Sequence, residues 1–138
     1  MLRDESCDLI ENEGAWVRPA TIEDWREVDE GLCRNAKRRG ELDAEEAALL
    51  RAAYRIRIWR EVGASSMIEY LELRLGYAPR TAHERLRVAL ALGELPGLAA
   101  ALATNEHPFT AIRELVRVVT PEIEDEWLDQ VRGMTVHE

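Results

Sequence analysis

The sequence predicts an all-α fold, arranged as a compact bundle of about six helices. Apolar residues recur at intervals of three and four positions along most of the chain, which is the period of an amphipathic helix. No segment alternates apolar and polar residues with the period of two that a half-buried strand shows. Glycine or proline marks the ends of the periodic segments, as expected where helices begin and stop.

Length and composition indicate one globular domain preceded by a tail. The chain has 138 residues, of which 46% are hydrophobic and 33% are charged, a balance typical of folded globular proteins. Residues 1–20 are acidic and lack periodicity, and we expect a flexible tail there. Residues 21–138 form the predicted single helical domain. Because no closing element is recognisable at its end, we expect the chain to be the first part of a longer protein or a shortened relative of one.

Two helices are predicted in the first half of that domain. Residues 21–39 form the first helix, which ends before Gly40. Residues 43–62 form the second helix, which begins with a capping box and ends at Gly63. The apolar stripe of this second helix consists of Leu50, Tyr54 and Ile58.

Five further helical segments follow. One begins at a capping box on Ser66 and is stopped by Gly76, and the next opens at a second capping box on Thr81 and reaches residue 92. The remaining segments are residues 96–103, 110–119 and 121–132. Two tryptophans, Trp59 and Trp127, are expected to anchor the core.

The net charge of −9 is unevenly distributed. The charge balance is −7 over residues 1–50, +4 over residues 51–92 and −6 over residues 93–138. A basic middle between acidic ends is compatible with an anion-binding patch. A solvated charged face would explain the same run of arginines.

Residues 66–92 have the layout of a helix-turn-helix. A short helix ends at Gly76, a brief connection follows, and the next helix opens with a dense group of polar side chains. In DNA-binding proteins of this kind, the first helix braces the second, whose N-terminal turn enters the major groove. Two helices joined by a glycine-containing turn also occur in domains that never contact DNA, so a scaffolding role stays open.

Two groups of DNA-contacting residues are predicted from this layout. The first group would face base edges from the start of the second helix and consists of Arg80, Thr81, His83 and Arg87. The second group would contact phosphates and consists of Arg74, Tyr77, Arg85, Arg113 and Arg117. Arg80 and Arg87 could equally be solvated or paired with glutamates of the acidic ends, and Tyr77 could simply plug the turn.

The order of elements after the helix-turn-helix resembles that of ParB-type partition proteins. A Leu-Pro pair at residues 95–96 opens a helix, a turn follows around Asn105, and the string PFTAIREL occupies residues 108–115. In those proteins the helix-turn-helix is likewise followed by a leucine-proline helix and by a helix with a buried small residue and an arginine. This resemblance implies DNA binding.

A more specific resemblance is carried by several strings in the same order. They are IEYLE at 68–72, LGYAPRTA at 75–82, ERLRVA at 84–89, RELVRVVTPE at 113–122 and WL at 127–128. They look like the N-terminal region of a family of bacterial HNH endonuclease proteins, known mainly from deltaproteobacteria, over roughly residues 42–138. The resemblance implies an all-helical module ahead of a C-terminal nuclease of the ββα-metal fold, with a histidine base and a divalent cation.

The nuclease itself is not recognisable in this sequence. The three histidines, His83, His107 and His137, are scattered and do not have metal-site spacing. Metal-assisted cleavage needs a ligated cation and a base that activates water. The sequence also contains no glycine-rich phosphate loop and no recognisable nucleophile motif. We therefore expect no enzyme activity, no metal site and no cofactor in this chain.

The sequence as a whole predicts a non-catalytic DNA-binding module, the targeting part or a shortened relative of an HNH endonuclease-type protein. The alternative is a protein-interaction or dimerisation module, whose acidic surface partners a separate nuclease or another basic protein. No secretion signal and no membrane segment is recognisable, so a cytoplasmic location is expected. No small-molecule substrate is evident.

Overall fold

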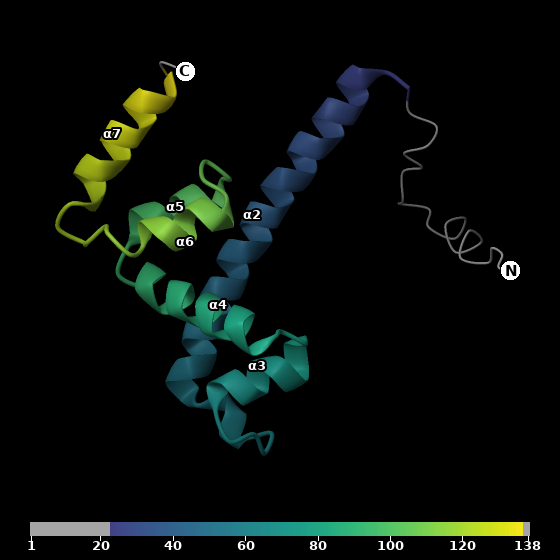
Figure 1. Cartoon of the computed structure of the whole chain (residues 1–138), viewed down its shortest axis with the longest axis vertical. Coiled ribbons are helices and arrows are strands. Elements are labelled where there is room, and N and C mark those ends of the chain that lie inside the picture. The colour runs from purple at the N-terminus through teal and green to yellow at the C-terminus, as the bar shows by residue number, and fades with distance from the viewer. Residues whose placement is uncertain (1–22, 137–138) are drawn as a thin grey trace, which may run out of the picture. The chain divides into compact units, whose positions relative to one another are not determined.

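The computed structural model describes residues 23–136, and all regular structure in that part of the chain is helical. Six α-helices and one short 3-10 helix are present there, which confirms the predicted all-α fold (Figure 1). The predicted tail at residues 1–20 lies outside the described residues. Contacts between residues divide the chain into two compact units, Met1–Ala36 and Lys37–Glu138.

The helices follow one another through short connections. In chain order they are α2 (Trp25–Ile56), η2 (Ile58–Arg60), α3 (Met67–Leu75), α4 (Pro79–Leu92), α5 (Pro96–Ala103), α6 (Phe109–Leu115) and α7 (Glu124–Val136). In the first unit, residues 25–36 form the start of α2. There the Asp24 side chain accepts a hydrogen bond from the backbone N–H of Arg26 at 2.9 Å, as an N-terminal capping residue does.

Helix α2 continues through Gly40, where the sequence predicted a break. Gly40 is buried, and a Cβ at this position would lie 2.6 Å from the carbonyl oxygen of Leu102 and 3.2 Å from Cβ of Asn105. The glycine therefore allows α2 to approach the end of α5 closely. The predicted boundary between residues 39 and 43 is wrong, because this glycine serves tertiary packing and not helix termination.

The end of α2 also differs from the prediction. The helix stops at Ile56, because Arg57 adopts the left-handed conformation with φ of 57°. The chain then turns so that Trp59 packs on the core, with its ring centroid 6.0 Å from that of Tyr54. Of the predicted apolar stripe, Leu50 is buried, whereas Tyr54 is exposed and Ile58 lies beyond the helix.

The core of the second unit is aliphatic and receives its largest fully buried side chains from α3, α4, α5 and α6, with Leu50 of α2 and Leu128 of α7 beside them. Its largest fully buried side chains are Leu71, Leu98, Leu102, Ile112 and Val88. Burial of each such side chain is worth about 1.5–3 kcal/mol, so these contacts hold the four helices in place. Trp59 and Trp127 pack against the edge of this core, as predicted for the two anchors.

The last two helices begin and end differently from the prediction. Helix α6 stops at Leu115, and α7 starts at Glu124, so Pro121 does not open a helix. The intervening turns allow Glu124 to reach α5: its buried carboxylate accepts the backbone N–H of Leu98 at 2.7 Å. This carboxylate satisfies a free N–H in the first turn of α5, where negative charge is favourable.

A membrane-spanning helix is not found among residues 23–136 when each helix is taken singly. Only α4 and α5 taken together have the length and apolar character of a span, and the two are bent by 120° relative to each other.

Candidate nucleic-acid interface

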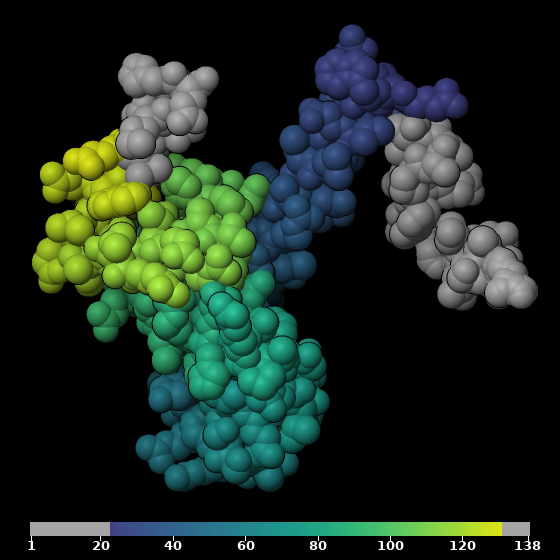
Figure 2. All heavy atoms as spheres, viewed as in Figure 1, coloured from purple at the N-terminus to yellow at the C-terminus, as the bar shows by residue number. Residues whose placement is uncertain are grey.

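Helices α3 and α4 pack against each other, and their atoms form one continuous region of the surface, teal in Figures 1 and 2. Ser66 caps α3: its Oγ accepts the N–H of Glu69 at 3.1 Å, and the Glu69 carboxylate accepts the N–H of Ser65. This confirms the capping signal at Ser66. The bond from Ser65 also lowers the pKa of Glu69. Helix α3 ends at Gly76, whose φ of 74° is left-handed and favours glycine.

Helix α4 begins earlier than predicted. Ala78 is the N-cap residue and Pro79 occupies the first helical position, where the fixed φ of proline suits a helix start. Thr81 therefore lies inside the first turn and does not cap the helix. Because alanine has no polar side chain, the first backbone N–H groups of α4 have no side-chain cap.

The four residues predicted to face base edges all lie on α4. Arg80 and His83 are exposed, whereas Thr81 and Arg87 are half-buried. Arg80, His83 and Arg87 follow one another at positions i, i+3 and i+7, which places them on one face of the helix. The Nη2 atom of Arg87 is buried and has no hydrogen-bond partner within the described residues. Arg74, a predicted phosphate contact, is exposed near the end of α3.

Two predicted phosphate contacts, Arg85 and Tyr77, are engaged inside the fold. Nη1 of Arg85 lies 2.8 Å from Oδ1 of Asp43 and 3.4 Å from Oε1 of Glu46. The same guanidinium stands 3.7 Å from the centre of the Phe109 ring. The Tyr77 hydroxyl donates to the other carboxylate oxygen of Glu46. This cluster of α2 acids satisfies Arg85 and Tyr77, so both side chains fasten α3 and α4 to α2 and are not presented to a ligand.

The surroundings of Tyr77 change its acidity. Burial and the hydrogen bond to Glu46 raise the pKa of Tyr77 to about 12 from an ordinary value of 10.0. Both effects disfavour the phenolate, because it would be poorly solvated and would face a carboxylate. The phenol therefore stays a hydrogen-bond donor over the physiological pH range.

The remaining two arginines differ in their surroundings. Nε of Arg113 lies 3.2 Å from Oε2 of Glu84 and 3.1 Å from Oε2 of Glu114, so it joins α6 to α4. Arg117 is mostly exposed, and its Nε lies 3.8 Å from Glu114. Exposed pairs at this distance contribute little to stability, so the Arg117 side chain can still move.

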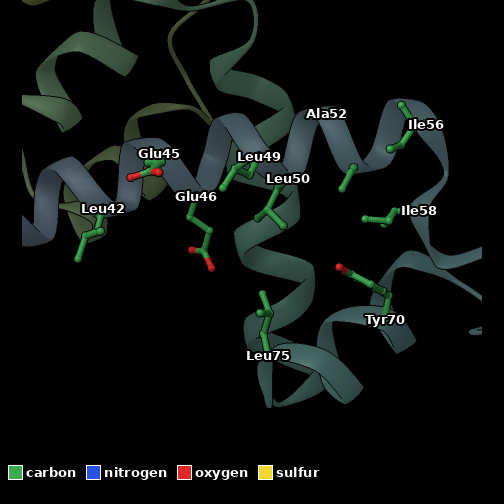
Figure 3. Close-up of a pocket in the computed structure, with 11 residues that line it drawn as sticks. Leu42, Glu45, Glu46, Leu49, Leu50, Ala52, Ile56, Ile58, Tyr70 and Leu75 are labelled. Atoms are coloured by element: carbon green, nitrogen blue, oxygen red, sulfur yellow. The ribbon is translucent and has the colours of Figure 1, made fainter. Parts of the chain in front are cut away.

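A second surface feature, an apolar groove between α2 and α3, was missed in the sequence. The groove has a volume of about 610 Å³ (Figure 3). Its walls include Leu42, Leu49 and Ile56 from α2, and Tyr70 and Leu75 from α3. The signal that could have revealed it is the spacing of seven residues between the three α2 side chains. We call this feature the α2–α3 groove.

No group of three or more His, Cys, Asp or Glu side chains between residues 23 and 136 is placed to hold a metal ion. Cys33 is exposed and its thiol is free. Comparisons with protein-family models, with curated proteins and with solved structures find no match for this chain.

Proposed function

We propose that this chain is a non-catalytic DNA-binding module in which α3 and α4 act as a helix-turn-helix. The observation that carries the proposal is the face of α4 on which Arg80, His83 and Arg87 stand in a row, with Glu84 one turn from both arginines. Helix α4 contains a single acidic residue, Glu84, and its carboxylate pairs with Arg113. This face is therefore cationic although the whole protein carries a net charge of −9.

The packing of α4 against the rest of the fold also favours the proposal, because it fixes the position of this face. Reading a base edge requires a side chain to be held within hydrogen-bonding distance of it, and a guanidinium can pair with guanine through two bonds. Helix α4 is held from behind by the fully buried Ala82, Val88 and Ala89. The bonds of Arg85 to α2 restrain it further. The uncapped N–H groups at its start are of the kind that donate hydrogen bonds to phosphate oxygens at other helix N-termini.

For some of the predicted DNA-contacting residues, the roles that we propose differ from those predicted from the sequence. We assign base contacts to Arg80 and His83, with Arg87 further along the same face. Arg74 and Arg117, which are exposed, are the phosphate contacts. A supporting role within the fold is assigned to Tyr77, Arg85 and Arg113.

Fluorescence anisotropy with a labelled random-sequence duplex tests this proposal. We expect binding at low salt that weakens as salt rises, with a log–log slope of about −0.9 for each phosphate contacted. The double variant Arg80→Ala/Arg87→Ala should lose most of the affinity. The matched control is Arg38→Ala/Arg39→Ala, which removes the same charge from two exposed positions of α2.

Two outcomes would contradict the proposal. The first is an absence of binding by the wild-type chain even at low salt. The second is an equal loss of affinity in the double variant and its control, because binding would then reflect total charge and not the α4 face. Circular dichroism of each variant should match the wild type, so that a loss of binding is not a loss of fold.

The sequence resemblance to HNH endonuclease proteins extends the proposal to a biological role. In that role, the module would direct a nuclease activity, carried by another domain or chain, to DNA. Co-purification of a nuclease with the tagged chain would support this role, and nuclease activity that is indifferent to the Arg80→Ala/Arg87→Ala variant would contradict it.

The second candidate function is a protein-interaction or dimerisation module. The specific observation that favours it is the α2–α3 groove, which exposes large apolar side chains of α2. Apolar grooves of this kind commonly receive the apolar face of a helix.

A further inference from the structure

The α2–α3 groove exposes a regular apolar row on α2. Leu42, Leu49 and Ile56 are 63%, 62% and 60% exposed. Their spacing of seven residues corresponds to about 10.5 Å along one face of the helix. Apolar side chains repeated every seven residues are the pattern by which helices associate with one another. A row of this kind is suited to contact with another helix, since exposed apolar patches often mark interaction sites.

The charges beside this row are segregated over residues 41–56 of α2. Within the stretch of α2 that carries the row, residues 41–50 include four acidic residues and no basic one, whereas residues 51–56 include two arginines and no acidic residue. Several of these charges are used within the fold, among them Asp43, which pairs with Arg85. Glu41 remains exposed at the acidic end of the row, and Arg55 remains exposed at the basic end.

We propose that the α2–α3 groove is a self-association surface, and that its occupant is α2 of a second copy running antiparallel. With Leu49 of the two copies meeting at a two-fold axis, Leu42 of each copy lies opposite Ile56 of the other. Glu41 of each copy then lies beside Arg55 of the other. A parallel pair would instead set the acidic stretch of one copy level with the acidic stretch of the other, and Arg55 level with Arg55. Opposite charges attract and like charges repel across an interface, so the segregation selects the antiparallel pair.

Other features of the groove fit this occupant. Ala52 and Ala53 line the groove one turn from Leu49, and their small side chains let two helices approach closely near the axis. The α3 wall, with Tyr70 and Leu75, extends the contact surface beyond α2 itself (Figure 3). A two-fold arrangement uses the same surface twice, as most dimers of identical chains do. The inference does not depend on DNA binding.

Sedimentation equilibrium of the full chain over a range of concentrations tests the proposal. We expect a monomer–dimer equilibrium for the wild type. Leu49→Glu places two carboxylates near the axis and should raise the dissociation constant by at least about tenfold. The matched control is Val118→Glu, because Val118 is also 60% exposed but does not line the groove. The control should dimerise as the wild type does.

A charge-reversal experiment tests the antiparallel orientation separately. Glu41→Arg alone and Arg55→Glu alone should each weaken self-association, because each creates two like-charge contacts. An equimolar mixture of the two variants should form a mixed dimer, since every contact then joins an arginine and a glutamate. The measurement is made at low ionic strength, where exposed charges are least screened.

Three results would overturn the proposal. A wild type that stays monomeric at all concentrations would exclude the second copy as occupant, including the case in which another segment of the same chain fills the groove. Dimerisation that Leu49→Glu leaves unchanged would place the interface elsewhere. A mixture that associates no better than either single variant would exclude the antiparallel arrangement.

Discussion

Replacement of Gly40 by alanine should destabilise the protein, although alanine is the better helix former. Helix propensity alone would make this change stabilising by about 1 kcal/mol. The new Cβ, however, would lie 2.6 Å from the carbonyl oxygen of Leu102. That oxygen accepts the N–H of Asn105 at 3.0 Å in the turn after α5. Backbone must therefore move to admit the methyl group, and overpacking of this kind costs about 1–3 kcal/mol.

The upper half of that range applies, because the close neighbour is backbone and not the end of a flexible side chain. Subtracting the propensity gain leaves a net loss of about 1–2 kcal/mol. Thermal unfolding followed by circular dichroism should show this as a Tm lower by roughly 4–8 °C for each kcal/mol lost.

Gly31→Ala is the matched control, because Gly31 lies in the same helix and its Cβ would meet only Nη2 of Arg34, at 3.9 Å. The control should not lower the Tm. A Tm raised by Gly40→Ala would refute the close approach of α2 and α5.

Two further changes test contacts that join helices. Glu124→Ala removes the acceptor of the Leu98 N–H and should cost about 1–3 kcal/mol in urea unfolding, whereas Glu124→Gln, which keeps an acceptor oxygen, should cost less. Equal losses in the two variants would contradict the capping role. In the folded protein, the pKa of Tyr77 is about 12, above the ordinary value of 10.0. The contribution of the protonated Tyr77 to the free energy of unfolding is therefore complete below pH 10.0 and is lost as the pH rises toward 12. Tyr77→Phe should remove the highest-pKa tyrosine from an ultraviolet titration, and a transition that persists there would contradict this environment.

The ends of α3 could be predicted from the sequence because their signals are local. Ser66 accepts a hydrogen bond from within the first turn of α3. Gly76 adopts the left-handed conformation that commonly ends a helix and that glycine adopts most easily. Gly40 was misread because the same residue type also serves close packing, and its neighbour Leu102 is far away in the sequence. The start of α4 was predicted at the wrong residue because the sequence carries two helix-start signals there. The predicted cap was Thr81, whereas the helix begins at Pro79.

The candidate site likewise contains some residues whose placement could be predicted from the sequence and others whose placement could not. The helical period alone places Arg80 and His83 together on an exposed face. The engagement of Arg85 could not be foreseen, because its partner Asp43 is 42 positions away. Only the tertiary fold decides which arginines meet carboxylates. The α2–α3 groove was missed for a related reason: its second wall, with Tyr70 and Leu75, belongs to α3, and only the tertiary fold places α3 beside α2.

Glu46 links the two surfaces and therefore cannot be used to separate them. It lines the α2–α3 groove, and it also accepts the Tyr77 hydroxyl and pairs with Arg85 behind α4. A change at Glu46 would disturb the groove and the support of α4 together.

Arg80 and Leu49 each belong to one surface only, so their variants can separate the two. Arg80→Ala should weaken DNA binding and leave self-association unchanged. If DNA is bound by the dimer, Leu49→Glu should lower DNA affinity in proportion to the dimer lost. If each copy binds independently, Leu49→Glu should leave the affinity per chain unchanged. The pair of variants thus determines whether the α4 face depends on the groove.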